Sequence, residues 1–303
     1  MAQAQTQTEF KIKFWGVRGS IPCPGRETVR YGGNTSCVEM CAGNQRLIFD
    51  GGTGLRLLGE ALVAESVPIA AHLFFSHSHW DHIQGFPFFT PAFQPQNRFN
   101  IYGVTADDEI PIQKRLHDQM LHPNFPVPLQ VMRAELNFVA LALGETVSLG
   151  EVRVTNGPLN HPGGAVGYRV DWQGLGVAYI TDTEHYGDRL DDQVLRLAQG
   201  ADVLIMDATY TDEEYHDPRH SKVGWGHSTW QEAVKVAQAA NVKQLILFHH
   251  DPSHGDDFLD GVQAAAQAVF PQTAIAQEGK TIILQASGEG NPGLPGSAQA
   301  LSV

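Results

Sequence analysis

Short apolar segments recur along this chain of 303 residues and constrain its fold more than any other feature. They are rich in β-branched and aromatic residues, and turn-forming residues separate them, which is typical of buried strands. We therefore expect strands at residues 10–15, 46–49, 72–75, 99–102, 152–155, 167–170, 177–180, 203–206, 244–248 and 281–284.

Helical patterns lie between some of these segments, and the interleaving of strands with helices predicts a layered α/β fold. Residues 119–129 contain too many prolines for a regular element and are expected to form a loop over a site or at a subunit contact. Helices are expected at residues 55–64, 110–121, 188–198, 229–239 and 258–268.

One domain is expected over residues 10–286, because a chain of this length can bury a large core. Residues 1–9 and 287–303 are polar, small and rich in Gly, Ser or Gln. They could not bury enough apolar surface to offset the entropy lost on ordering, so we expect both segments to be disordered.

Composition and charge narrow the class of protein. No segment approaches the roughly 20 apolar residues that span a bilayer, and the N-terminus lacks a secretory pattern, which predicts a cytoplasmic protein without a membrane partner. Three cysteines, Cys23, Cys37 and Cys41, indicate reduced thiols. The net charge of -13 and the absence of any run of Lys or Arg argue against a long nucleic acid as partner.

The strongest chemical signal is the segment His77-Ser78-His79-Trp80-Asp81-His82, which follows a predicted strand. Alternate residues of an extended chain share a face, so His77, His79 and Asp81 are expected to point the same way, and His82 joins them as the chain turns. Imidazole and carboxylate ligands together suit zinc, with manganese or iron as alternatives. A polar surface loop is the other interpretation, and the preceding strand favours the metal site.

Single candidate ligands follow predicted strands further along the chain. They are His161 in the segment NHPGG, Asp182 in ITDT and His249 in LFHHD. Taken alone, each fits a hydrogen-bonded or exposed polar residue. Their repeated position after a strand is expected when loops at one edge of packed sheets build a site.

These motifs resemble the metallo-β-lactamase superfamily, and the resemblance covers nearly all of residues 10–285. It implies an αββα sandwich with the active site at one edge of the two sheets. It also implies two divalent metal ions, with zinc as the first choice and manganese or iron as alternatives. The implied ligands are His77, His79 and His161 for one metal, Asp81, His82 and His249 for the other, and Asp182 for both.

Asp50 precedes a glycine turn, where the family has an acidic residue that orients a ligand histidine. By itself it fits a turn-forming aspartate equally well. Two metals about 3.5–4 Å apart lower the pKa of a shared water and neutralise charge on a phosphoryl group. We therefore expect attack by a metal-bridged hydroxide, with Asp81 among the catalytic residues as well as the ligands.

A second motif offers a proton donor. Residues 226–233 open a predicted helix in which Thr229 and Glu232 have the spacing of a capping box, and the cap leaves His227 without a role. Together with residues 207–210, this segment resembles the tRNA 3′-processing endonuclease (tRNase Z) branch. The resemblance implies that His227 is the general acid for the leaving group and that Asp207, where the family commonly has Glu, steadies it.

The tRNA-cutting enzymes hold their substrate with a basic, glycine-rich arm inserted after the third metal histidine. Only about twenty residues separate His161 from Asp182, which suffices for two strands and a turn but not for an arm. With the acidic net charge, this shifts the expected substrate to a small phosphodiester, and a 3′,5′-cyclic nucleotide is the first choice.

Three segments, 15–20, 30–36 and 224–227, resemble bacterial phosphodiesterase-like members of the superfamily. Many members are dimers, which makes residues 119–129 a candidate contact in a homodimer. Glycine-rich turns with a structural arginine are the alternative interpretation of the N-terminal segments. The candidates for binding a phosphate or base are Arg18, Asn34, Ser36 and Trp225.

Other functions stay open. The same metal pair would activate water for hydrolysis of a lactone, thioester or sulfate, and an RNA endonuclease like tRNase Z is a further alternative. A di-iron redox or sensor protein, or a binding module without turnover, belongs to another class, and the full set of ligand residues argues against the binding module.

Overall fold

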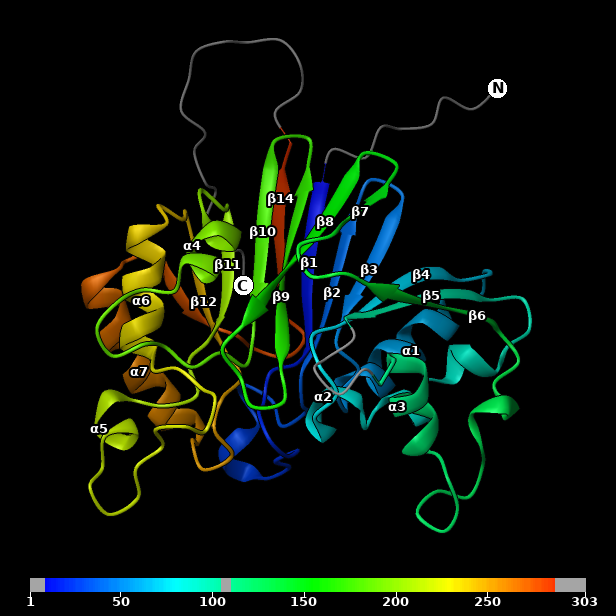
Figure 1. Cartoon of the computed structure of the whole chain (residues 1–303), viewed down its shortest axis with the longest axis horizontal. Coiled ribbons are helices and arrows are strands. Elements are labelled where there is room, and N and C mark those ends of the chain that lie inside the picture. Colours follow the sequence, from blue (N-terminus) through cyan, green and yellow to red (C-terminus); the bar gives the residue numbers. More distant parts are fainter. Residues whose placement is uncertain (1–8, 105–109, 287–303) are drawn as a thin grey trace.

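The computed structural model describes residues 9–104 and 110–286 and is built on two seven-stranded sheets (Figure 1). The predicted disordered segments 1–9 and 287–303 lie outside the described residues except for Glu9. Glu9 is the first residue of a strand because it pairs with Gln285 near the end of the described chain. The strand therefore begins one residue before the predicted domain boundary.

The first sheet has the order β14-β1-β2-β3-β4-β5-β6. The strand β1 pairs antiparallel with β14 and β2, whereas β3 to β6 run parallel. Its strands are β1 (Glu9–Gly16), β2 (Cys37–Ala42), β3 (Gln45–Phe49), β4 (Ala70–Phe75), β5 (Arg98–Val104), β6 (Glu135–Leu141) and β14 (Thr281–Gln285).

The second sheet has the order β13-β12-β11-β10-β9-β8-β7. Its first four strands in that order run parallel, and β9 pairs antiparallel with both β10 and β8. Its strands are β7 (Thr146–Leu149), β8 (Val152–Leu159), β9 (Ala165–Trp172), β10 (Leu175–Ile180), β11 (Val203–Asp207), β12 (Leu245–Phe248) and β13 (Thr273–Ile275).

Helices cover the outer faces of both sheets, so the layers follow the αββα order (Figure 1). The helices α4, α6 and α7 pack on the second sheet, and α1 and α3 pack on the first. The helices are α1 (Gly54–Ala64), α2 (Trp80–Ile83), α3 (Ile112–Asp118), α4 (Asp192–Ala198), α5 (Asp212–Tyr215), α6 (Trp230–Ala239) and α7 (Asp256–Val269). Single 3-10 turns are η1 (Arg26–Thr28), η2 (Phe86–Phe88), η3 (Thr90–Phe93) and η4 (Leu129–Val131).

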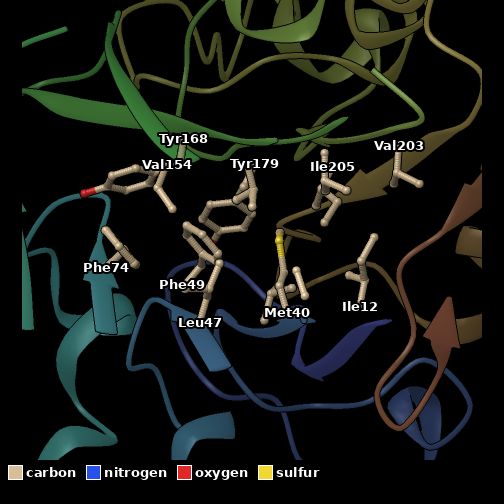
Figure 2. Packing of buried hydrophobic residues seen from close by; sticks show 14 of the residues in the cluster. Ile12, Met40, Leu47, Phe49, Phe74, Val154, Tyr168, Tyr179, Val203 and Ile205 are labelled. Atoms are coloured by element: carbon tan, nitrogen blue, oxygen red, sulfur yellow. The ribbon is translucent and has the colours of Figure 1, made fainter. Parts of the chain in front are cut away.

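The largest core lies between the two sheets (Figure 2). Phe49 of β3 is fully buried there and stacks on Phe74 at 5.4 Å between ring centroids. From the opposite sheet, Tyr168 and Tyr179 pack against the same ring at 5.5 and 5.6 Å. Burial of one such side chain contributes about 1.5–3 kcal/mol to the stability of the fold, so this interface holds the two sheets together.

Each predicted strand overlaps a strand of the structure, but four strands were not predicted: β2, β6, β7 and β13. Two helices are shorter than expected. Asp191 accepts a hydrogen bond from the Gln193 backbone N–H, so α4 begins at Asp192 instead of residue 188. The helix expected at 110–121 is limited to Ile112–Asp118.

Residues 119–129 form a loop, as predicted, up to the start of η4. The Gln119 side chain donates to the Ile83 carbonyl at 3.1 Å, and Phe125 packs edge-on against Phe88, so the loop lies beside α2. The three cysteines are free thiols, as expected. Within the described ranges, no helix has both the length and the apolar character to cross a bilayer.

Candidate active site

Polar residues follow the ends of several strands at one edge of the sandwich. The strands β3 and β4 are parallel, and so are β10, β11 and β12, which places their carboxyl ends together within each sheet. The strand β8 runs in the same direction as β10, because both are antiparallel to β9. Asp207 is the last residue of β11, and the residues that follow the other ends are Asp50, residues 76–82, His161, Asp182 and His249.

The segment 77–82 is extended only as far as His79. The helix α2 then begins at Trp80, so Asp81 and His82 project from a helical turn. The expectation that Asp81 shares a face with His77 and His79 is therefore wrong, because the helix redirects it. As a result the segment supplies two separate groups of side chains.

The first group consists of His77, His79 and His161, each of which offers one ring nitrogen within 4.8 Å of the other two. The distance from His161 Nε2 to His79 Nδ1 is 3.0 Å. His77 Nε2 is buried and has no hydrogen-bond partner. A buried nitrogen without a partner is costly, so three imidazoles facing one point fit a cation at that point.

The second group consists of Asp81, His82, Asp182 and His249. Asp182 lies between the two groups: its Oδ1 is 3.8 Å from His77 Nε2, and its Oδ2 is 3.1 Å from His82 Nε2 and 3.2 Å from His249 Nε2. This is the position that a carboxylate bridging two cations would need. The mixed nitrogen and oxygen donors suit zinc, manganese or iron.

Electrostatics differ between the two groups. Burial lowers the pKa of His77 well below its usual value, so this ring is neutral and able to bind a metal. Burial raises the pKa of Asp182, but the imidazoles of His249 and His82 outweigh it and hold that pKa well below its usual value. Burial lowers the pKa of His82, yet the carboxylates around it raise that pKa well above normal. A bound cation would take the place of that proton.

Further groups contact the Nδ1 atoms of three candidate ligand histidines and so fix the orientation of their rings. Asp50 Oδ2 lies 2.8 Å from His82 Nδ1 and accepts from the Tyr179 hydroxyl at 2.8 Å, in the orienting position expected for Asp50. His161 Nδ1 donates to the Gly226 carbonyl at 2.8 Å. Thr209 Oγ1 lies 3.1 Å from His249 Nδ1.

Three of these residues have left-handed backbone conformations within two residues of the ends of their strands. The φ angles are 60° at Asp50, 52° at Asp182 and 63° at His249. Non-glycine residues rarely adopt this region, and such strain gathers at functional sites where surrounding structure enforces it. Here the sharp turn directs each side chain toward the site instead of along the strand.

His227 lies beside both groups and is paired with Asp207. Its Nδ1 is 2.8 Å from Asp207 Oδ2, and Asp207 also accepts from the Thr209 hydroxyl at 2.7 Å. The ring stacks on His249 with centroids 4.9 Å apart. Burial lowers the pKa of His227, but Asp207 raises it to about 9. The imidazole can therefore carry a proton at neutral pH.

The helix start after His227 is only half of the predicted capping box. Thr229 accepts from the Glu232 backbone N–H at 3.2 Å, but the Glu232 carboxylate pairs with Lys235 instead of returning to the cap. The Thr229 hydroxyl donates a hydrogen bond to the Asp212 carboxylate at 2.6 Å.

Two of the N-terminal candidates for substrate binding, Arg18 and Asn34, have side-chain contacts within the protein. Arg18 is fully buried and donates to the carbonyls of Gly32, Asp251 and His254, contacts that fit the alternative interpretation of a structural arginine. Ser36 is also fully buried.

Asn34 is held by Glu278, with 3.0 Å between Nδ2 and Oε2. Trp225 differs from the other three candidates because it is 57% exposed.

Two residues beside Arg18 contact the second group and were not predicted. The Ser20 backbone N–H donates to Asp81 Oδ2 at 2.7 Å. Gly19 lies so close to His249 that an added Cβ would be 2.3 Å from its ring. Only backbone atoms make these contacts, so no side-chain motif could have indicated them.

The family model of the β-lactamase superfamily domain matches residues 45–250. The chain belongs to the metallo-β-lactamase superfamily. It is a metal-dependent hydrolase, and membership implies divalent metal ions, for which the two side-chain groups offer a site.

Curated relatives of this superfamily member include ribonuclease Z of Brevibacillus brevis, 34% identical over 46% of the chain and 41% of that protein. Ribonuclease Z of Archaeoglobus fulgidus is 26% identical over 89% of the chain and 96% of that protein. Two solved structures share the fold. The metallo-β-lactamase fold protein YhfI of Bacillus subtilis has a TM-score of 0.69 at 20% identity, covering 91% of this chain and all (100%) of that one. A diphosphatase of the PhnP family has a TM-score of 0.64 at 17% identity, covering 90% and 97%.

Proposed function

We propose that the protein hydrolyses a small phosphodiester and that 3′,5′-cyclic nucleotides are its substrate class. His77, His79 and His161 would hold one cation, Asp81, His82 and His249 the other, and Asp182 both. When bound, the cations supply an activated water and neutralise charge on the phosphoryl group. Zinc is the proposed metal, because imidazole and carboxylate donors suit it.

The buried pair of His227 and Asp207 carries the proposal. An alcohol leaves phosphorus as a strongly basic oxygen, so its departure requires a proton donor. His227 Nδ1 is occupied by Asp207 at 2.8 Å, which leaves Nε2 to hold the proton for the leaving oxygen. Asp207 favours the protonated ring, since it raises the pKa of His227 to about 9 against the opposing effect of burial.

The size of the substrate is argued from the segment between His161 and Asp182. Strands β9 and β10 fill it and are joined by a turn at Gln173 and Gly174, so no inserted arm is present there. The net charge of -13 would repel a long polyanion over most of the surface. A small phosphodiester avoids both difficulties.

An RNA endonuclease is the second candidate. Relatives named ribonuclease Z align along most of the chain, among them that of Archaeoglobus fulgidus over 89% of it. The same cluster and the same His227 would serve cleavage of RNA, so the site chemistry does not separate the two candidates. Substrate length does.

A turnover screen separates these candidates from the other esterases. The zinc and manganese forms are each offered 3′,5′-cyclic nucleotides, cyclic dinucleotides, a linear phosphodiester, a precursor tRNA and a lactone. We expect the highest kcat/KM with a cyclic nucleotide. Preference for precursor tRNA would replace the proposal with the endonuclease, and turnover of the lactone alone would overturn phosphodiester hydrolysis. Two irons and a visible absorption band in the purified protein would indicate a redox protein instead.

A further inference from the structure

Trp225 is a large aromatic side chain on the surface, and it is next in sequence to a residue that contacts a candidate metal ligand. It is 57% exposed, although a tryptophan normally buries most of its surface. The next residue, Gly226, accepts a hydrogen bond from His161 Nδ1 at 2.8 Å. The indole is therefore one residue away from a contact with a candidate metal ligand.

Glu184 fixes the backbone on both sides of Trp225. Its carboxylate accepts from the Gly224 N–H at 2.6 Å and from the Gly226 N–H at 3.0 Å. It also accepts from the Tyr215 hydroxyl at 2.5 Å. A buried carboxylate with three donors is a strong anchor, because each bond to an ionised group is stronger than a neutral one.

The same glutamate joins this segment to the loop that carries His161. Its backbone N–H donates to the Asn160 carbonyl at 2.8 Å, and Asn160 Nδ2 donates to its carbonyl at 2.9 Å. The glycines beside Trp225 have φ angles of 85° and 86°, which only glycine adopts readily. The chain therefore turns sharply on either side of the indole and holds it outward.

The surroundings of the indole suit a nucleotide. Lys222 Nζ lies 4.2 Å from the centroid of the Trp225 ring, a cation–π contact that restrains the ring. Arg219 is exposed but pairs with Asp217 at 3.7 Å, so Lys222 is the cation that contacts the indole. An exposed indole stacks on any nucleobase, and nearby cations favour the phosphate.

We propose that Trp225 is the platform on which the base of a nucleotide substrate stacks and that Glu184 is the residue that positions it. This inference rests on the proposed function, because it names the base as the part of the phosphodiester that the protein recognises. It assigns Glu184 a role that neither the metal cluster nor the general acid requires.

Binding of products tests the platform separately from turnover. Calorimetric titration of the zinc-loaded protein compares adenosine 5′-monophosphate with ribose 5-phosphate, which lacks the base. Wild type should bind the nucleotide roughly 10- to 100-fold more tightly, the range expected for one stacked base. In Trp225→Ala this ratio should fall to about one, whereas Trp225→Phe should retain most of it.

Val223→Ala is the matched control, because Val223 is 58% exposed on the same segment but is not flanked by the two amides that Glu184 holds. It should keep the wild-type ratio. Glu184→Gln should reduce the ratio while ribose 5-phosphate binds as before, since a loosened platform affects only the base. A general loss of folding would weaken both ligands alike.

The inference is overturned if wild type shows no preference for the nucleotide, or if Trp225→Ala keeps the full ratio. If the ratio behaves as expected but no cyclic nucleotide is hydrolysed, the proposed function fails and the platform stands. If cyclic nucleotides are hydrolysed but the affinity ratio is the same in wild type and Trp225→Ala, the platform alone fails.

Discussion

Asp182 and His227 show how single residues divide the chemistry of the site. Asp182 is almost wholly buried and contacts His77, His82 and His249, so it has no position from which to donate a proton to a substrate. His227 belongs to neither of the two groups that would hold the cations, and one of its nitrogens is already bound to Asp207. The first residue is suited to gather cations and the second to move a proton.

Replacing His227 by alanine tests that division. Turnover of an alkyl phosphodiester should fall by about 10²- to 10⁴-fold, the usual contribution of a general acid. Turnover of a 4-nitrophenyl phosphodiester should fall far less, because that leaving group departs without a proton. The two rates are measured by steady-state kinetics with zinc content checked by elemental analysis. An equal loss on both substrates at unchanged zinc content would contradict the role of His227 as acid.

At the scale of elements, the sequence predicted those strands whose apolar residues are either continuous, as in β11 and β12, or regularly alternating, as in β1. The strands β11 and β12 are buried on both faces between a helical layer and the other sheet, so they appear as uninterrupted apolar runs. The strand β6 alternates exposed with partly buried residues, and β7 and β13 are short, so their patterns are weak. The strand β2 was not predicted, because Glu39 and two cysteines lie among its aliphatic residues.

The candidate site shows the same limit. The residues with side-chain chemistry could be singled out from their position after strands, and the structure brings them together. What could not be predicted are contacts made by the backbone, such as that of Ser20 with Asp81. The burial of Arg18 also needed coordinates, since its partners are carbonyls more than 200 residues away in two of three cases.

The loop that contains Gly19 gives a prediction at this scale. Gly19→Ala would place a Cβ 2.3 Å from the His249 ring, so the ring or the loop must shift and the second group of ligands is disturbed. We expect the zinc content to fall from two ions toward one and turnover to fall with it. Gly25→Ala is the control, because nothing lies within 4 Å of a Cβ at Gly25. Elemental analysis of both variants decides the matter, and full zinc content in Gly19→Ala would refute the prediction.

His250, at the end of β12, links that strand to the chain after β13 and predicts a pH effect on stability. Its Nε2 is 3.0 Å from the Ala276 carbonyl, and burial lowers its pKa to about 3. Between pH 6.5 and 3 the His250 imidazole is protonated in the unfolded chain but not in the folded chain, so the free energy of unfolding decreases as the pH falls.

The size of that loss is about 1.4 kcal/mol for each pH unit below 6.5. His250→Gln keeps a donor for Ala276 but does not titrate, so its free energy of unfolding should fall less steeply between pH 6.5 and 5. Urea unfolding at several pH values measures both slopes. Identical slopes in the two proteins would show that His250 is not the source.

At the scale of the whole molecule, buried acidic side chains lie where the two sheets meet, so bound cations would link the two sheets. The segment 77–82 belongs to the first sheet, whereas His161, Asp182 and His249 belong to the second. Burial of Asp50, Asp81, Asp182 and Asp207 in one region concentrates negative charge where the sheets meet. A cation shared between the halves would offset that charge and hold the layers together.

Removal of metal should therefore destabilise the entire fold and not only abolish activity. A ligand present at 100 times its Kd stabilises the native state by about 2.7 kcal/mol, and 1 kcal/mol shifts the Tm of a large domain by roughly 2–4 °C. Chelation should thus lower Tm by about 5–10 °C by these values, and added zinc should restore it. Asp182→Asn removes the shared carboxylate, so chelator should change its Tm much less. Both proteins keep the same sheets and cores, so the comparison isolates the effect of the metal. If elemental analysis shows that the metal is gone and the Tm of wild type is unchanged, the prediction is wrong. The two sheets would then be held together by the apolar interface around Phe49 alone.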